Sequence, residues 1–243
     1  PGPPRRPYSA YLFDLDGTVY LGDTLLPGAR ETVLGLREAG IPVRFLSNNP
    51  TRSPAEYAQK LEHMGLPTPV EEITNTVVST TRWLRANVPD AVVYPIAEAP
   101  LIDALREAGV PLSDDPRRID IVLASYDRTF TYGKLQIAFD TLWRAGRGAR
   151  LMSTNPDRYC PFPGGHGEPD TAGIVAAIEA TTGVRCERTF GKPEAQIAQM
   201  ALEGIDVDPA ECAMVGDRLS TDIAVARSAG LASVLVLTGD SRA

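Results

Sequence analysis

This sequence of 243 residues has little of several residue types on which catalytic and structural sites often depend. It contains only three cysteines and two histidines, and aromatic residues make up 7% of it. Two histidines leave little material for a histidine-rich zinc site or a histidine-based catalytic triad. Three cysteines, odd in number and widely spaced, are typical of reduced thiols rather than of a disulfide framework, so we expect a cytoplasmic protein.

The sequence also lacks an excess of positive charge and long apolar runs. It has 24 basic and 31 acidic residues, and its formal net charge is −7. This balance argues against a surface for nucleic acids or for anionic membranes. No apolar stretch approaches the roughly 20 residues of a membrane-spanning helix. The proline-rich start, residues 1–9, lacks the apolar segment of a signal peptide, and we expect a disordered tail there.

The sequence does contain four short polar segments, each placed directly after an apolar run. They are Asp14 to Thr18, Ser47 to Asn49, Gly191 to Pro193, and Gly216 to Arg218 with Asp222 just beyond. The first segment follows a strand predicted over residues 10–13. Because side chains alternate along a strand, Asp14 and Asp16 leave its end toward the same side. Ligands of open α/β sheets bind at that end of the strands.

Together the segments contain the groups that phosphate chemistry requires. Two carboxylates about 4 Å apart repel by roughly 4 kcal/mol at an effective dielectric near 20, so Asp14, Asp16 and Asp217 favour a hard cation such as Mg²⁺ among them. One carboxylate would attack phosphorus, and another would exchange protons with the leaving oxygen and with water. For a phosphoryl group, Lys192 supplies positive charge, and Ser47 and Asn48 supply neutral hydrogen-bond donors.

Each segment also has a plainer interpretation. An aspartate at the end of a strand is more often a helix cap or a turn residue than a catalyst. The residues before Pro50 are consistent with the start of a helix, and Gly191 to Pro193 with an exposed turn. The shared position of all four segments after apolar runs, with complementary chemistry, favours a common site.

In this order, the four segments resemble the four motifs of the haloacid dehalogenase superfamily of phosphohydrolases. The resemblance is closest to the branch with a large cap inserted between the second and third motifs, which includes p-nitrophenyl, phosphoglycolate and pyridoxal phosphatases. It extends from about Tyr11 to Thr238 and includes the segment Ser153-Thr154-Asn155-Pro156-Asp157.

The resemblance implies a role for each residue. Asp14 would be the nucleophile that forms an aspartyl phosphate, and Asp16 would be the general acid and base. Dehalogenating members lack an aspartate at the place of Asp16, which argues for ester hydrolysis. Ser47 and Lys192 would hold the phosphoryl group, with Asn48 beside them. Mg²⁺ would be bound by Asp14, the backbone carbonyl of Asp16 and Asp217, and Asp222 would lie in or just behind that shell.

Helix-like and strand-like patterns alternate along the chain, which indicates an α/β fold with a parallel sheet. Helices are predicted over 27–40, 54–65, 76–88, 98–109, 132–146, 171–183, 194–202 and 222–229. Strands are predicted over 10–13, 42–46, 91–94, 119–125, 150–153, 212–215 and 233–237. We expect a Rossmann-like core domain, residues 10–75 and 186–243, with an inserted α/β cap domain, residues 76–185. Many members of the branch continue into another strand where this sequence ends; we expect an effect on one sheet edge, not on the site.

Specificity would come from the part of the chain that covers the core. A glycine-rich loop, residues 161–170, offers His166, Glu168 and Asp170 for hydrogen bonds to sugar hydroxyls or an amine. Alternatively, the loop is solvated and Asp170 caps the helix that follows it. Asn155 and Asp157 also have two interpretations: they belong to the site, or they form a turn at the end of a strand in the cap.

Three functions are compatible with these residues. The first is a Mg²⁺-dependent phosphomonoesterase acting on a small phosphorylated metabolite, with a sugar phosphate as a candidate. A phosphotransferase or mutase would use the same aspartyl phosphate but would need a cap that excludes water or holds an acceptor. A metabolite-binding protein without turnover would not require Asp14, Asp16 and Lys192 together. The resemblance further implies a homodimer that forms through the cap.

Overall fold

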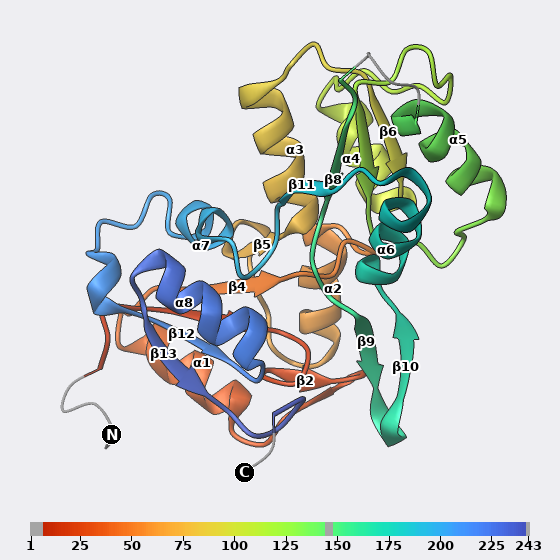
Figure 1. Ribbon diagram of the computed structural model, residues 1–243. Coiled ribbons are helices and arrows are strands. Elements are labelled where there is room, and N and C mark those ends of the chain that lie inside the picture. Colours follow the sequence, from red (N-terminus) through yellow and green to blue (C-terminus); the bar gives the residue numbers. More distant parts are fainter. Residues whose placement is uncertain (1–6, 144–147, 242–243) are drawn as a thin grey trace.

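The chain forms two parallel β-sheets, one above the other (Figure 1). The computed structural model describes residues 7–143 and 148–241. The lower sheet in Figure 1 has five strands, and both ends of the chain lie beside it. The upper sheet has four strands, all from the middle and later part of the sequence. Helices pack on both faces of each sheet. The predicted α/β class with parallel sheets is confirmed.

The five-stranded sheet has the first predicted strand at its centre. Its order is β13 (Ala232–Leu235), β12 (Cys212–Gly216), β1 (Ala10–Asp14), β4 (Val43–Ser47) and β5 (Ile73–Asn75). Its helices are α1 (Ala29–Glu38) and α2 (Pro54–His63) on one face, and α7 (Ala195–Ala201) and α8 (Ala224–Ala229) on the other. Phe13 packs into the first of these cores and Leu12 into the second. Burial on both faces explains why β1 is a continuous apolar run before Asp14.

The four-stranded sheet repeats this layered arrangement. Its order is β11 (Cys186–Thr189), β8 (Arg150–Ser153), β7 (Ile121–Ala124) and β6 (Val93–Ile96). One face packs on α3 (Thr76–Asn87) and α4 (Ala99–Glu107), and the other on α5 (Tyr132–Trp143) and α6 (Thr171–Thr182). In the described part of the chain, no helix is both long enough and apolar enough to cross a membrane.

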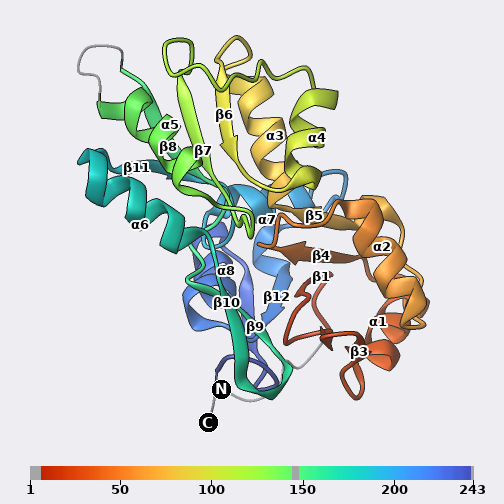
Figure 2. The same cartoon turned by 90° about the vertical axis from the view of Figure 1, so that its right-hand side faces the viewer.

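An antiparallel hairpin connects the two levels of the molecule. Its strands are β9 (Tyr159–Phe162) and β10 (His166–Pro169), and Cys160 lies opposite Glu168 in its register. The hairpin runs from the upper sheet down beside the lower sheet (Figures 1 and 2). A second, shorter hairpin, β2 (Tyr20–Leu21) and β3 (Thr24–Leu25), follows the first polar segment.

Several details differ from the sequence predictions. Neither β5 nor the hairpin of β9 and β10 was predicted, because β5 is only three residues long and the hairpin contains proline and glycine. Strand β11, which begins at the boundary predicted before residue 186, was not predicted and pairs with β8 in the upper sheet. The N–H of Ser9 donates to the carbonyl of Glu211 (2.8 Å), so the predicted disordered tail does not include Ser9. Residues 1–6 of that tail lie outside the described residues.

Candidate active site

The predicted site residues meet where three neighbouring strands of the lower sheet end. Asp14 is the last residue of β1, Ser47 is the last of β4, and Asp217 follows β12 directly. Parallel strands bring these ends to one edge of the sheet. The loop after β11 adds Lys192, and the segment from the end of β8 through the hairpin to the start of α6 contributes the opposite side. The pocket there is lined by Asp14, Asp16, Ser47, Asn48, Asn49, Asp157, Tyr159, Cys160, Pro161, Asp170, Lys192, Arg218, Thr221 and Asp222.

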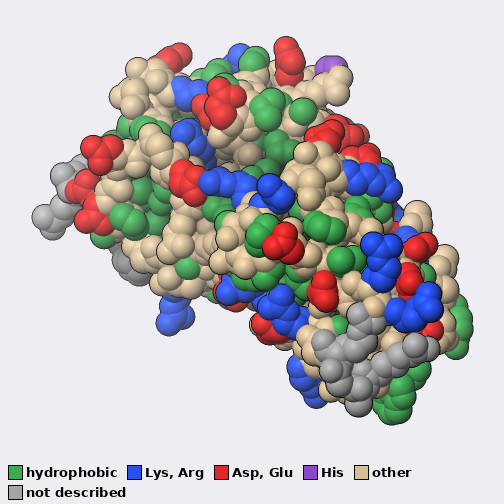
Figure 3. Space-filling view, turned by 90° about the horizontal axis from the view of Figure 1, so that it is seen from above, with side chains coloured by type: hydrophobic (Ala, Val, Ile, Leu, Met, Phe, Trp, Pro, Cys, Tyr) green, Lys and Arg blue, Asp and Glu red, His purple; other side chains and the backbone are tan. Residues whose placement is uncertain are grey.

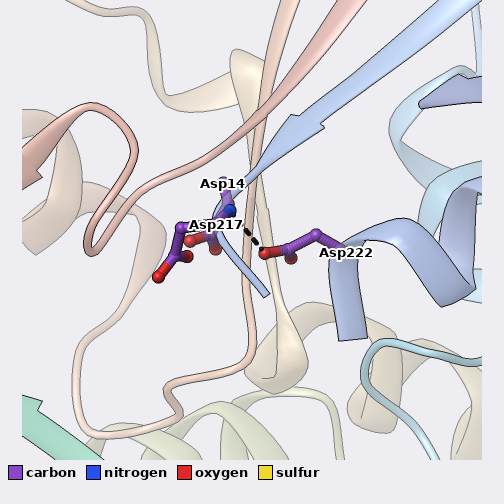
Figure 4. A group of neighbouring side chains, drawn as sticks. All are labelled: Asp14, Asp217 and Asp222. Carbon is purple, nitrogen blue, oxygen red and sulfur yellow. Dashed lines mark hydrogen bonds between the residues drawn. The ribbon is translucent and has the colours of Figure 1, made fainter. Parts of the chain in front are cut away.

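Three buried carboxylates, those of Asp14, Asp217 and Asp222, converge at this sheet edge (Figure 4), and two of them, Asp14 and Asp222, line the pocket. One oxygen from each of Asp14, Asp217 and Asp222 lies within 4.8 Å of the others. The Asp222 carboxylate is held by the backbone: its Oδ2 accepts the N–H of Asp217 (3.1 Å) and of Arg218 (3.0 Å). Gly216 makes room for it, because a Cβ on that residue would lie 2.2 Å from the Cβ of Asp222.

The chemistry of this cluster fits a divalent cation. The Oδ1 atom of Asp217 is buried and has no hydrogen-bond partner within the described part of the chain. Burial raises the pKa of Asp14 well above its usual value, partly offset by Lys192, and burial also raises the pKa of Asp217. A buried carboxylate oxygen without a donor is costly, and a hard cation satisfies it. The Asp16 side chain, also predicted as a metal ligand, is not among the three carboxylates that converge.

Lys192 is the cation already in contact with the cluster. Its Nζ forms an ion pair with Asp14 and lies 2.7 Å from Oδ1 of Asp222. Burial by itself lowers the pKa of this lysine, but the two carboxylates outweigh burial and raise the pKa above its usual value. Lys192 therefore carries its positive charge at the pocket floor at neutral pH.

Asp16 has surroundings different from those of Asp14. Its Oδ2 accepts a hydrogen bond from the hydroxyl of Tyr20 (3.2 Å), whose ring lies 4.0 Å from Nζ of Lys60. Burial raises the pKa of Asp16 despite the opposing influence of Lys60. A carboxyl group with a raised pKa retains a proton at higher pH, which suits a group that donates a proton to a leaving oxygen.

The Asn48 side chain uses its hydrogen bonds within the protein. Its Nδ2 donates to Oδ2 of Asp157 (2.8 Å) and to the carbonyl of Lys192 (3.0 Å), and its Oδ1 accepts the N–H of Lys192 (2.7 Å). The amide thus holds the Lys192 loop in place and keeps no free N–H for a phosphoryl group. The Ser47 hydroxyl also donates within the protein, to the hydroxyl of Tyr57 at 3.3 Å, and it lines the pocket.

Sequence reasoning missed the role of Asp157 and Arg218 in joining the two sheets. Asp157 follows β8 of the upper sheet, and its Oδ1 accepts a hydrogen bond from Nη1 of Arg218 (2.9 Å) in the lower one. Its Oδ2 also accepts from Nδ2 of Asn155 (2.9 Å). Both residues were noticed within motifs, but no local pattern indicates a contact between segments 61 residues apart.

The three loop residues predicted to read the substrate lie in different places. His166 is exposed and does not line the pocket. Asp170 lines the pocket, and its carboxylate also caps α6 by accepting the N–H of Thr171, as the alternative interpretation predicted. Glu168 lies on β10 and accepts a hydrogen bond from the hydroxyl of Tyr126.

The fold and the site together define an α/β enzyme of the class that acts on phosphorylated compounds. Family models agree: the haloacid dehalogenase-like hydrolase model matches residues 11–111, and a second HAD-hydrolase-like model matches residues 189–243. The chain belongs to the haloacid dehalogenase-like hydrolase family. The resemblance predicted from the four motifs is confirmed.

Relatives and solved structures place the chain among phosphatases of this family. It is 36% identical to the sugar-phosphatase AraL of Bacillus subtilis, over 95% of this chain and 84% of that protein. It is also 36% identical to an acid sugar phosphatase of Staphylococcus haemolyticus, over 96% of this chain and 86% of the relative. The crystal structure of a 4-nitrophenylphosphatase from Thermotoga maritima superposes with a TM-score of 0.90 at 31% identity, covering 97% of this chain and 88% of that one. The enzyme is a phosphatase.

Proposed function

We propose that this enzyme hydrolyses sugar phosphate monoesters through an aspartyl phosphate. The observation that supports this most directly is the placement of two aspartates at the end of β1: Asp14 pairs with Lys192 and belongs to the carboxylate cluster, and Asp16 accepts a hydrogen bond from Tyr20. Relatives that match almost the whole chain are named sugar phosphatases. Their names support a sugar phosphate as the substrate here.

In the proposed reaction the two aspartates divide the work. A carboxylate oxygen of Asp14 attacks phosphorus, and the ester P–O bond breaks as Asp16 gives its proton to the leaving oxygen. Asp16, now a carboxylate, takes a proton from water, and the resulting hydroxide attacks the phosphorus of the aspartyl phosphate. The bond to Asp14 breaks, inorganic phosphate leaves, and Asp16 is again protonated.

Lys192 and Ser47 are proposed to hold the phosphoryl group during both steps. Lys192 supplies positive charge close to Asp14, and the Ser47 hydroxyl lies on the pocket wall next to it. Fixed donors and charges that face the transferring group stabilise the transition state without reorganisation. Asn48 contributes by positioning the Lys192 loop, since its side chain bonds both the N–H and the carbonyl of that residue.

We propose Mg²⁺ as the cation held by Asp14, Asp217 and the backbone carbonyl of Asp16, with Asp222 supporting them. All of these donors are oxygens, which Mg²⁺ prefers. When bound, the ion neutralises negative charge between the aspartates and the phosphoryl oxygens. The unpartnered Oδ1 of Asp217 and the buried position of the cluster support this assignment.

The test is release of inorganic phosphate from a panel of phosphorylated metabolites and p-nitrophenyl phosphate, with Mg²⁺ and with EDTA. We expect Mg²⁺-dependent release that is fastest for sugar phosphates. Transfer of the phosphoryl group to a sugar acceptor without release would indicate a mutase or transferase instead. Equal release in EDTA would contradict the metal assignment.

We also propose a homodimer, a division into two domains and a cytoplasmic location. A homodimer through the upper sheet is supported by α5, where Tyr132 and Trp143 are 80% and 60% exposed and Phe139 stacks on Trp143. Figure 3, which looks down on this end of the molecule, shows hydrophobic side chains near its right-hand edge. The division into a core domain and an inserted cap, and a cytoplasmic location, also remain proposals.

A further inference from the structure

The cations that line the pocket are already engaged by carboxylates of the protein. Lys192 faces Asp14 and Asp222, and Arg218 is bonded to Asp157 at 2.9 Å. No third lysine or arginine is among the described residues that line the pocket. Once a phosphoryl group occupies the floor, no lysine or arginine among the described lining residues is left for a second anionic group.

The wall that would face the organic part of the substrate is acidic. Asp170 lines the pocket and forms no ion pair within the described ranges. Cys160 also lines it, and Glu168 stands directly opposite Cys160 in the hairpin. Directly opposed residues of an antiparallel pair project from the same face of the sheet, so Glu168 extends the wall outward from Cys160.

The other groups on this wall are neutral hydrogen-bonding groups. The Tyr126 hydroxyl donates to Glu168. Burial, with a smaller effect from Asp16, raises the pKa of the Cys160 thiol to about 12, so the thiol is uncharged at neutral pH. Nearby, Arg128 donates to both oxygens of Glu98 at 2.7 Å, which neutralises its charge. The surface beyond the phosphate site therefore presents two carboxyl groups, neither in an ion pair within the described ranges, among neutral hydrogen-bonding groups.

We propose that this acidic wall, formed by Glu168 and Asp170 beside Cys160, selects phosphate monoesters whose organic part carries hydroxyl groups and no second anionic group. The inference rests on the proposed function and specifies its substrate class. Hydroxyl groups donate to carboxylates, whereas a second carboxylate or phosphate meets like charge without a partner. Sugar and polyol monophosphates are thereby favoured over phosphorylated acids and bisphosphates.

The test compares two substrates that differ in one group, 2-hydroxyethyl phosphate and 2-phosphoglycolate. With the Mg²⁺-loaded enzyme, we expect kcat/KM to be at least about tenfold higher for the alcohol, because like charges in a partly desolvated site repel strongly. The ratio should fall in Glu168→Gln and as salt rises. Glu38→Gln, which removes the same charge from the exposed end of α1, should leave it unchanged.

Asp170→Asn provides a second variant, because asparagine caps a helix as well as aspartate does, and it should also lower the ratio. Equal or faster hydrolysis of 2-phosphoglycolate by the unmodified enzyme would overturn the inference while leaving the proposed function standing. A ratio that neither variant changes would overturn the role of the wall. Failure to hydrolyse either compound or p-nitrophenyl phosphate would overturn the proposed function, and this inference with it.

Discussion

Asp14 and Asp16 are two positions apart on the same strand end, yet their surroundings prepare them for different chemistry. Asp14 contacts Lys192 and belongs to the carboxylate cluster, so the ionised form that attacks phosphorus has positive charge beside it. Asp16 is bonded to Tyr20, and burial raises its pKa. Two carboxyl groups with different environments can act as nucleophile and acid in one site.

Replacing Asp14 by asparagine should abolish turnover while the protein remains folded. The amide is a poor nucleophile, and we expect kcat to fall by about a thousandfold or more, as for other variants that lack the nucleophile. Phosphate release measures the loss, and circular dichroism measures the fold. Full activity in a folded Asp14→Asn variant would exclude Asp14 as the nucleophile.

Replacing Asp16 by asparagine should slow the reaction unequally for different substrates. An amide cannot protonate the leaving oxygen, so alkyl phosphates, with poor leaving groups, should lose about a hundredfold or more in kcat. p-Nitrophenyl phosphate needs less protonation and should lose much less in the first step. The comparison of the two rates is the measurement, and equal losses would contradict the acid role.

Asp217→Asn should remove the effect of Mg²⁺ on stability. The Oδ2 of Asp217 accepts the N–H of Asp240, a bond that an asparagine oxygen retains, so the fold should persist. Mg²⁺ binds the native state and should raise the melting temperature of the unmodified enzyme in a concentration-dependent way. Thermal unfolding at increasing Mg²⁺ measures this rise, and an undiminished rise in the variant would exclude Asp217 as a ligand.

At the scale of single elements, the loop after β4 is held by the start of α2. Ser53 and Glu56 form a capping box: the Ser53 hydroxyl accepts the N–H of Glu56 (3.2 Å), and the Glu56 carboxylate accepts the N–H of Ser53 (2.6 Å). This cap places the helix start directly after the segment that contains Ser47. The hydroxyl of Tyr57, in the first turn of α2, receives the hydrogen bond from Ser47.

Ser53→Ala should lower the free energy of unfolding by about 1 kcal/mol, the usual cost of a lost cap. Urea unfolding measures this change. Ser53→Thr serves as the control, because threonine also caps helices, and it should retain most of the stability. If alanine and threonine have the same effect, the cap does not contribute to the stability of the helix.

At the scale of the whole molecule, the contacts of Asp157 fasten the upper sheet to two loops of the lower one. Its two carboxylate oxygens bond Arg218 and Asn48, and the side chain is 7% exposed. Asn48 in turn holds the backbone of Lys192. Through this chain of bonds, the position of the upper sheet is connected to the proposed phosphate-binding lysine.

Asp157→Ala should lower the free energy of unfolding by about 2 kcal/mol, because the partly buried Arg218 would lose its partner. Arg218→Ala and the double variant complete a double-mutant cycle. The double variant should lose less than the sum of the two single losses, since the same bond is missing in all three. Simple additivity in urea unfolding would show that the pair does not couple the two sheets.

The polar segments were predictable because each depends on local order in the sequence. An apolar strand followed by a polar segment places Asp14, Ser47 and Asp217 at one sheet edge, whatever the details of packing. The contacts of Asp157 with Asn48 and Arg218 were not predictable, because they join segments separated by 109 and 61 residues. Strands β5 and β11 were not predicted either, because both are short and weakly patterned. They form strands through their pairing with β4 and β8, which the local sequence does not reveal.

The sequence by itself determined the α/β class and the family, and it predicted the residues of the proposed chemistry, because alternating patterns and short motifs are local properties of the chain. Only the tertiary structure decided which groups remain free to act. It showed that the Asn48 amide is fully used, that Asp170 caps a helix while lining the pocket, and that the Asp16 side chain is not among the three converging carboxylates. Hydrogen bonds and ion pairs between distant segments depend on how the two sheets pack, and that packing is decided by burial across the whole chain.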